Sequence, residues 1–176
     1  GLPDTVITVI DEAYDTFIDT ADYPFAKEYV EKKNVLVLKT FSKAYGLAGL
    51  RIGYCLAGAP LAACMEKARQ PFNVSLLAQE AALAALGDRA FLEKTRTTVL
   101  EGKRWLYGEF TKLGLTYVPS ETNFILVDVK RDCAKLFQDM LKLGVIVRDM
   151  KAYKLDTFIR VTVGTPRENR KFIAAL

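Results

Sequence analysis

The chain has 176 residues, of which 51% are hydrophobic, and a formal net charge of +4. This length and composition are sufficient for a sizeable core, in one large domain or two small ones. The 25 basic and 21 acidic residues are interspersed without a block of like charges, so we expect no nucleic-acid partner. Histidine is absent, which excludes the usual zinc sites and any histidine-dependent triad, and we expect no metal.

The three cysteines show no CxxC or zinc-like spacing. Cys55 and Cys64 stand in apolar surroundings, so we expect both to be buried and reduced. No apolar run has membrane-spanning length, and the first residues do not resemble a signal peptide. These features predict a cytoplasmic protein with no membrane partner.

Short β-branched runs predict strands in the first third of the chain, at residues 5–10, 34–38 and 51–58. Continuous apolar runs of this kind are typical of strands buried on both faces of a parallel α/β sheet. The segment between the first two runs has the length of a crossover and contains a helical stretch near residues 25–32. Ligands bind at the carboxyl ends of such strands, where this chain places polar residues.

The middle of the chain predicts three helices. The first begins near Pro60, which suits a first helical position, and the second begins at the N-cap Ser75 and ends at Gly87. A long amphipathic helix follows over residues 89–114, ending at Gly114.

The last third predicts a compact α/β unit. Strand, helix, strand, strand and helix follow one another, and Thr165 with Glu168 forms a capping-box pattern before the final helix. We therefore place a domain boundary near residues 112–118. Residues 1–112 would form the end of a larger domain with its bridging helix, and residues 113–176 a small carboxy-terminal domain.

Lys43 follows the second predicted strand, in the stretch TFSKAYGLAGLRIGY. Hydroxyl groups at Thr40 and Ser42 and the guanidinium of Arg51 are groups that bind phosphate. A lone lysine is most often an exposed charge, but a shielded lysine amine is a nucleophile towards carbonyl groups. Together these residues indicate a Schiff-base cofactor that carries a phosphate, such as pyridoxal phosphate, whose ring nitrogen requires a carboxylate partner.

Five stretches resemble the fold-type I pyridoxal-phosphate aminotransferases, and among them the histidinol-phosphate aminotransferases. These are VIDEAYDTF, KTFSKAYGLAGLRIGY, NFILVDV, GVIVRDM and IRVTVGTPRENRKF, spread over nearly the whole chain. The resemblance implies an α/β fold that combines the end of the large cofactor-binding domain, a mostly parallel sheet with helices, with a small α/β domain. Chains of that family are much longer, so we expect this chain to be the carboxy-terminal portion of the enzyme, which would be a homodimer.

The resemblance also implies roles for individual residues. Lys43 is similar to the lysine that holds the cofactor covalently and is the catalytic residue. Asp11 is similar to the carboxylate at the ring nitrogen, and Tyr14 to the phenol that hydrogen-bonds the ring oxygen O3′. The residues similar to the phosphate ligands are Thr40, Ser42 and Arg51.

Two residues near the carboxyl terminus resemble substrate-binding positions. Arg160 is similar to the arginine that binds the anionic group of the substrate, and Asn123 to a positioning residue. Taken singly, some of these side chains would also suit structural roles: Arg160 could form an ion pair with Glu121 or Asp149. In the same way, an aspartate after a strand can simply cap a turn, and a tyrosine can simply pack.

The implied reaction is amino exchange between L-histidinol phosphate and 2-oxoglutarate, giving imidazole acetol phosphate and L-glutamate in histidine biosynthesis. One alternative is a phosphothreonine decarboxylase or another amino-acid aminotransferase of the same family. An alternative of another class is a non-catalytic fragment that associates with a partner chain through an exposed strand edge. We expect the isolated chain to be inactive, because the family's amino-terminal half supplies the ring-stacking aromatic residue and a phosphate-binding helix N-terminus.

Overall fold

A computed structural model describes residues 2–3, 5–31 and 34–176. Its contacts form two compact units, one of Gly1–Thr16 with Thr20–Glu93 and the other of Phe17–Asp19 with Lys94–Leu176. The units divide within helix α3 (Arg89–Lys112), and the domain boundary near residues 112–118 stays a prediction about the family's domains. No helix within the described ranges is long and apolar enough to cross a membrane.

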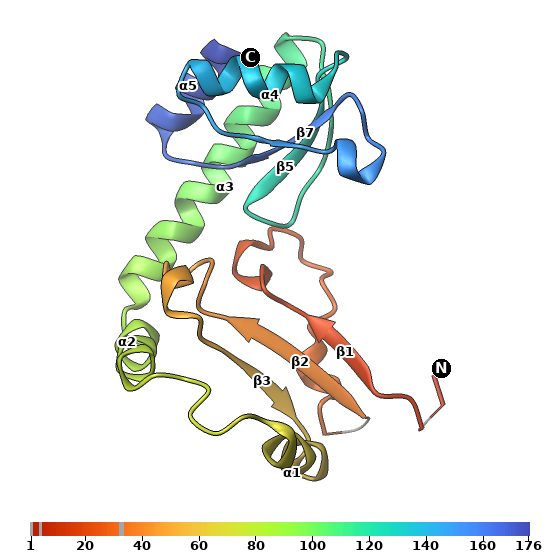
Figure 1. Cartoon of the computed structure of the whole chain (residues 1–176), viewed down its shortest axis with the longest axis vertical. Coiled ribbons are helices and arrows are strands. Elements are labelled where there is room, and N and C mark those ends of the chain that lie inside the picture. Colours follow the sequence, from red (N-terminus) through yellow and green to blue (C-terminus); the bar gives the residue numbers. More distant parts are fainter. Residues whose placement is uncertain (1, 4, 32–33) are drawn as a thin grey trace. The chain divides into compact units, whose positions relative to one another are not determined.

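The first unit contains a three-stranded sheet in the order β1-β2-β3 (Figure 1). β1 (Thr8–Asp11) runs parallel to β2 (Val35–Thr40), and β3 (Gly53–Ala57) runs antiparallel to β2. The α/β class predicted from the sequence is confirmed. Because β1 and β2 are parallel, their carboxyl ends lie at the same edge of the sheet.

The prediction that β1 is buried on both faces is wrong for this chain. Val9 is 54% exposed, whereas Val37 of the neighbouring strand is fully buried. The reason is position in the sheet: β1 is the edge strand of the described sheet, and β2 lies between two neighbours. The core of this unit therefore lies around β2, where Val35 and Val37 pack with Ala26 and Val30.

The segment between β1 and β2 is less helical than predicted. In place of a helix near residues 25–32 it forms a single 3₁₀ turn, η2 (Ala26–Tyr29), while residues 32 and 33 lie outside the described part. A second 3₁₀ turn, η1 (Asp15–Phe17), follows β1, and a third, η3 (Ala48–Leu50), precedes β3. Short turns suffice here because the chain returns to β2 at Val35 within a few residues.

The predicted helices of the first unit are present as α1 (Ala59–Ala68) and α2 (Leu76–Gly87). Pro60 lies in the first turn of α1, and the Ser75 hydroxyl accepts a hydrogen bond from the amide of Ala78 at 3.2 Å, so both predicted starts are confirmed. The prediction for Cys64 is wrong, because α1 buries none of its residues and Cys64 is exposed. Cys55 on β3 is partly buried.

The second unit contains an antiparallel sheet in the order β4-β5-β7-β6. Its strands are β4 (Thr116–Val118), which was not predicted from the sequence, β5 (Phe124–Asp128), β6 (Arg148–Asp149) and β7 (Phe158–Thr162). The helices are α4 (Cys133–Lys142), α5 (Pro166–Ala175) and most of α3, with a 3₁₀ turn, η4 (Lys151–Tyr153). The capping box of Thr165 and Glu168 at the start of α5 is confirmed.

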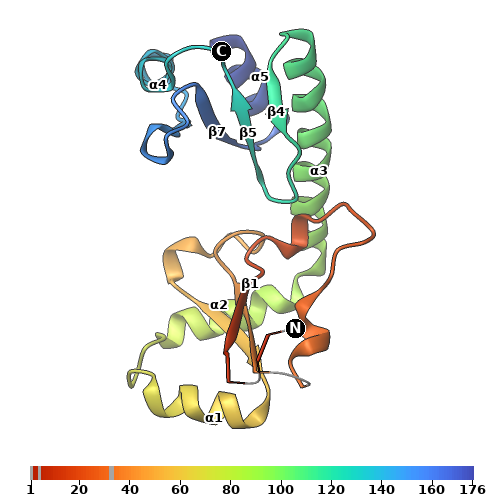
Figure 2. The same ribbon diagram turned by 90° about the vertical axis from the view of Figure 1, so that its right-hand side faces the viewer.

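The two faces of this sheet differ. Ile125, Val127, Ile159 and Val161 are buried, and alternation along the strands puts them on one face. Helix α3 runs beside β4 and α5 (Figure 2), where the ring of Phe110 contacts a tyrosine of β4 and a phenylalanine of α5. The opposite face carries half-buried side chains from β5 and β7. Arg160 lies on this opposite face, because it alternates along β7 with the buried Ile159 and Val161.

Residues 17–19 belong to the second unit because α3 binds them. Arg96 and Lys103 donate hydrogen bonds to backbone carbonyls of this segment at 3.0 and 3.2 Å. Arg104 pairs with the Asp19 carboxylate at 2.9 Å. Lys103 and Arg104 follow Arg96 by seven and eight positions, about two helical turns, so the three side chains lie towards the same side of α3.

Lys103 is a buried lysine whose amine satisfies two backbone carbonyls, those of Phe17 at 3.2 Å and Ser120 at 2.8 Å. It is 4% exposed, and burial lowers the pKa of its ammonium group below the ordinary lysine value. We expect Lys103→Met to lower the free energy of unfolding by about 1–3 kcal/mol, because both carbonyls lose their donor.

Urea unfolding followed by the fluorescence of Trp105, the single tryptophan, measures this change within the second unit. The pKa of Lys103 is lower in the folded protein than in the unfolded chain. The free energy of unfolding of the wild type therefore increases as the pH rises towards about 10.4, the ordinary pKa of lysine. The difference in free energy of unfolding between the wild type and Lys103→Met should therefore widen above neutral pH.

Lys112→Met, which removes a 73% exposed side chain, is the control and should change the free energy of unfolding by less than about 0.5 kcal/mol. A Lys103→Met protein as stable as the control would contradict the prediction.

Candidate active site

Lys43 lies in the loop that follows β2, at the shared carboxyl edge of β1 and β2. Its side chain is exposed, and its Nζ lies 5.4 Å from the centre of the Tyr14 ring, which comes from the segment after β1. An ammonium group at this distance from an aromatic face is attracted to it. The structure therefore brings these two predicted residues together, although they are 29 positions apart in the sequence.

Asp11 is the last residue of β1 and is paired in register with Leu38 of β2. Its Oδ1 accepts a hydrogen bond from the amide of Ala13 at 3.0 Å. The turn-capping role considered for Asp11 is therefore correct for one carboxylate oxygen. The turn leads directly to Tyr14, so Asp11 and Tyr14 are held by the same short piece of backbone.

Thr40 and Ser42 continue β2 into the Lys43 loop. The Thr40 hydroxyl oxygen accepts a hydrogen bond from the Ser42 amide at 3.0 Å, which curls the chain just before the lysine. The hydroxyl proton of Thr40 and the whole hydroxyl of Ser42 remain available to donate to an anion.

Arg51 reaches this edge through the hairpin between β2 and β3. Thr40 pairs with Gly53, and the Phe41 amide donates to the Ile52 carbonyl at 3.2 Å, so Arg51 directly precedes the paired part of the hairpin at this edge. Arg51 has φ of 53°, and its Nη1 donates to the Ala48 carbonyl at 3.0 Å.

Gly53 is required for the close approach of the two hairpin strands. A Cβ at position 53 would lie 2.6 Å from the Lys39 carbonyl oxygen, closer than atoms can pack. Gly53 therefore allows β2 and β3 to pair closely just before the Lys43 loop.

Lys39 was not among the residues predicted for the site, although it is the centre of an ion cluster beneath it. Its Nζ lies 2.6 Å from Glu12 Oε2 and 2.5 Å from Asp15 Oδ2. Burial alone would lower the pKa of Lys39, but its hydrogen bonds to Asp15 and Glu12 outweigh burial and raise it. No signal in the sequence identifies this cluster, because it depends on the register between β1 and β2.

Arg160 lies on β7 in the second unit, with its guanidinium carbon 4.8 Å from the centre of the Phe124 ring. No ion pair with Glu121 or Asp149 occurs among the described residues, so a purely ion-pairing role for this arginine is not supported. Glu121 instead accepts a hydrogen bond from the amide of Asp19 at 2.6 Å.

Arg148 is a second arginine that sequence reasoning missed. The register of β6 and β7 pairs it with Arg160, and both line a cavity of about 530 Å³ together with Thr162. Asn123 is not among the described residues that line this cavity, and its carbonyl accepts a hydrogen bond from the Val163 amide at 2.9 Å. Two guanidinium groups beside one cavity would suit an anion of charge −2.

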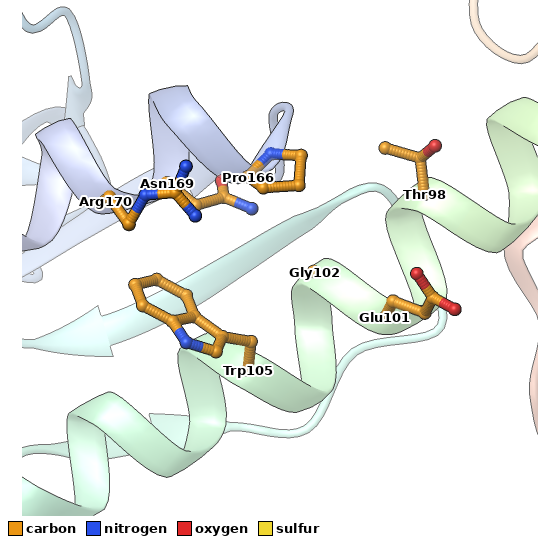
Figure 3. A pocket seen from close by; sticks show the side chains of 7 residues that line it. All are labelled: Thr98, Glu101, Gly102, Trp105, Pro166, Asn169 and Arg170. Atoms are coloured by element: carbon orange, nitrogen blue, oxygen red, sulfur yellow. The ribbon is translucent and has the colours of Figure 1, made fainter.

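A separate cavity of about 200 Å³ lies between α3 and α5 (Figure 3). The Trp105 side chain lies opposite Asn169 and Arg170, while Thr98 and Glu101 lie at the other end of the cavity (Figure 3). None of the residues predicted for the active site is among its described lining residues. This cavity is therefore not the candidate active site.

The predicted residues thus fall into two groups, one at the edge of β1 and β2 and one on β7 and the turn before β5. Lysine, carboxylate, phenol and guanidinium groups at the carboxyl edge of an α/β sheet are of the kinds that bind a phosphorylated aldehyde cofactor. A profile of the aminotransferase class I and II family matches residues 4–176, and the chain belongs to this family.

Curated relatives carry a more specific name. The chain is 49% identical to the histidinol-phosphate aminotransferase of Moorella thermoacetica, over 99% of this chain and 46% of the relative. It is also 49% identical to that of Akkermansia muciniphila, over 99% of this chain and 48% of the relative. The chain therefore spans about half the length of the curated relatives it matches.

Solved structures agree in fold. The histidinol-phosphate aminotransferase of Sinorhizobium meliloti in complex with pyridoxal-5′-phosphate superposes with a TM-score of 0.89 and 33% identity, over 99% of this chain and 49% of that one. L-threonine-O-3-phosphate decarboxylase from Porphyromonas gingivalis superposes with a TM-score of 0.85 and 26% identity, over 98% of this chain and 54% of that one. The predicted α/β fold is confirmed by this agreement.

Proposed function

We propose that this chain forms the carboxy-terminal part of a pyridoxal-phosphate-dependent aminotransferase that exchanges the amino group of L-histidinol phosphate with 2-oxoglutarate. The observation that carries the proposal is the gathering of Lys43, Asp11, Tyr14 and Arg51 at one sheet edge. Relatives that are 46 to 49% identical and bear the name histidinol-phosphate aminotransferase support the choice of reaction.

The residues present fit pyridoxal phosphate chemically. Arg51 with the hydroxyls of Thr40 and Ser42 offers donors for the phosphate, and Asp11 offers a carboxylate oxygen for the protonated ring nitrogen. Tyr14 offers a phenol to the ring oxygen, and the Lys43 amine lies beside the Tyr14 ring. Each functional group of the cofactor that requires a partner thus has one of matching chemistry.

When bound, pyridoxal phosphate supplies an aldehyde that condenses with amines and a ring that accepts the electron pair released at the substrate Cα. Lys43 would hold the cofactor through its amine, and the same amine would be placed to move the proton at the substrate Cα. Asp11 holds the proton on the ring nitrogen, which keeps the ring able to accept charge. Arg51, Thr40 and Ser42 fix the phosphate and thereby the orientation of the ring.

The substrate proposal rests on the second unit. Arg148 and Arg160 are cross-strand neighbours beside one cavity, which favours a phosphate monoester over a carboxylate alone, because two guanidinium groups match its double charge. The carboxylate of 2-oxoglutarate would use the same arginines in the other half-reaction. The resemblance to L-threonine-O-3-phosphate decarboxylase favours a second candidate, decarboxylation of phosphothreonine, whose substrate also carries a phosphate.

A panel of amino donors tests this proposal. We expect the complete protein that contains this segment to react with L-histidinol phosphate, which converts the lysine-bound cofactor to its amine form with loss of visible absorbance, and 2-oxoglutarate should restore it. O-phospho-L-threonine tests the second candidate through release of carbon dioxide. Aromatic amino acids should react more slowly, because they lack the phosphate.

The isolated chain is the control in the same assay. We expect no steady turnover from it, because it would lack the phosphate contacts that the family's amino-terminal half supplies. Loss of even two charge-assisted contacts at about 1.5–3 kcal/mol each weakens cofactor binding about a hundredfold or more. Exclusive reaction with a donor that has no phosphate would overturn the substrate. Absence of any bound cofactor in the complete protein would favour the remaining alternative, a non-catalytic segment that associates with a partner chain.

A further inference from the structure

Each of the two residues proposed to contact the cofactor ring, Asp11 and Tyr14, is followed directly by an acidic residue. Glu12 follows Asp11 directly, and Asp15 follows Tyr14 directly. Both acids bind the same amine: Lys39 Nζ lies 2.6 Å from Glu12 and 2.5 Å from Asp15. Lys39 comes from the neighbouring strand β2, so its amine joins both acids to β2.

The cluster is shielded from solvent. The Glu12 side chain is 1% exposed and that of Lys39 is 14% exposed, whereas that of Asp15 is 28% exposed. The second oxygen of Glu12 accepts a hydrogen bond from the Ala26 amide at 2.8 Å, which ties the start of η2 to the same point. A buried carboxylate needs its counter-ion, so loss of Lys39 would leave Glu12 with an uncompensated buried charge.

Backbone hydrogen bonds complete the connection. The Glu12 amide donates to the Leu38 carbonyl at 3.0 Å, and the Asp15 amide donates to the Glu12 carbonyl at 3.2 Å. The segment from Asp11 to Asp15 is therefore fixed by β2 at its start and by Lys39 at both acids. Lys43 follows Lys39 by four residues on the same strand and loop, so the amine and the ring-contacting side chains share one support.

From this geometry we infer that Lys39 is a positioning residue, which holds Asp11 and Tyr14 in place for the cofactor through Glu12 and Asp15. This inference rests on the proposed function for its ligand, pyridoxal phosphate. The Lys39 amine is engaged by the two acids and is not among the groups proposed to contact the cofactor or the substrate. Its effect is transmitted by Glu12 and Asp15, the acids that directly follow Asp11 and Tyr14.

The test compares Lys39→Met with Lys39→Arg in the complete protein. At a temperature where all variants are folded, Lys39→Met should weaken pyridoxal phosphate binding about tenfold to a hundredfold, by analogy with the loss of a group that orients a metal ligand. Lys39→Arg keeps the charge and should recover most of the affinity. Lys142→Met, which removes a 75% exposed lysine paired with Asp139, is the matched control and should leave affinity unchanged.

Hydrogen exchange supplies a readout that does not depend on the cofactor. In Lys39→Met the amides of Ala13 and Ala26 should exchange faster, while those of β3 keep the wild-type rate. If the complete protein binds no pyridoxal phosphate, the proposed function fails. The exchange rates of the Ala13 and Ala26 amides still test whether Lys39 holds this segment in place. If Lys39→Met does not fold, Asp15→Asn takes its place, since it removes only the more exposed acid, and it should weaken binding less.

Two outcomes would overturn the inference. One is cofactor affinity within twofold of wild type in a folded Lys39→Met protein. The other is equal acceleration of exchange throughout the first unit with unchanged affinity, which would assign Lys39 to general stability alone.

Discussion

Lys43→Ala is expected to abolish transamination by the complete protein. The lysine amine is the only group at this sheet edge that is proposed both to bind the cofactor covalently and to move the substrate proton. Loss of the proton transfer alone should lower kcat about a hundredfold to ten-thousandfold. The fold should survive, because the Lys43 side chain is exposed and its described contact is the Tyr14 ring at 5.4 Å.

Borohydride reduction followed by peptide mapping measures the covalent link directly. The reduced cofactor should be found on Lys43 in the wild-type protein, and the Lys43→Ala protein should show neither this label nor the visible absorbance. Lys142→Ala, which removes an exposed lysine of α4, should keep both label and activity. A label on another lysine, together with full activity of Lys43→Ala, would overturn the assignment.

Asp11→Asn is expected to produce the second largest effect. The asparagine oxygen can still accept the hydrogen bond from the Ala13 amide, so the turn that carries Tyr14 should remain. What is lost is the negative charge that holds a proton on the ring nitrogen, and with it the capacity of the ring to accept charge. We expect kcat to fall about a hundredfold to a thousandfold, comparable with removal of one preorganised charge-stabilising group.

Steady-state kinetics with L-histidinol phosphate and a thermal unfolding curve separate the two contributions. The melting temperature should change little while kcat falls, because the substitution preserves shape and the turn. Asp139→Asn, on the exposed face of α4, is the matched control and should retain wild-type kcat. An Asp11→Asn protein within a few-fold of wild type would count against the proposed contact with the ring nitrogen.

Local signals in the sequence determined most of the elements. Ser75 and the Thr165–Glu168 pair start helices where predicted, because a cap is a contact between residues three positions apart. The strand runs became β2, β3, β5 and β7 for a similar reason, since alternation and β-branching act within a few residues. The family resemblance, which also depends on contiguous motifs, was confirmed by the profile match.

Some elements could not be read locally. β4 has only three residues, too few for a period to be recognised, and it forms because β5 pairs with it. The stretch near residues 25–32 has a helical pattern but forms one 3₁₀ turn, since the Ala26 amide is bound by Glu12 and the chain must return to β2. The exposure of Val9 likewise depends on which strands lie beside β1.

For the candidate site, the sequence by itself determined which residue types stand at the ends of β1 and β2, because the strands and their terminal polar residues are contiguous. Only the tertiary structure decided that Lys43 lies beside Tyr14, that Arg148 is paired with Arg160, and that one lysine, Lys39, joins the two acids that follow β1. The physical reason is strand register. A shift of one residue moves every side chain of a strand to the other face, and the register is set by long-range packing and hydrogen bonding that no short stretch of sequence records.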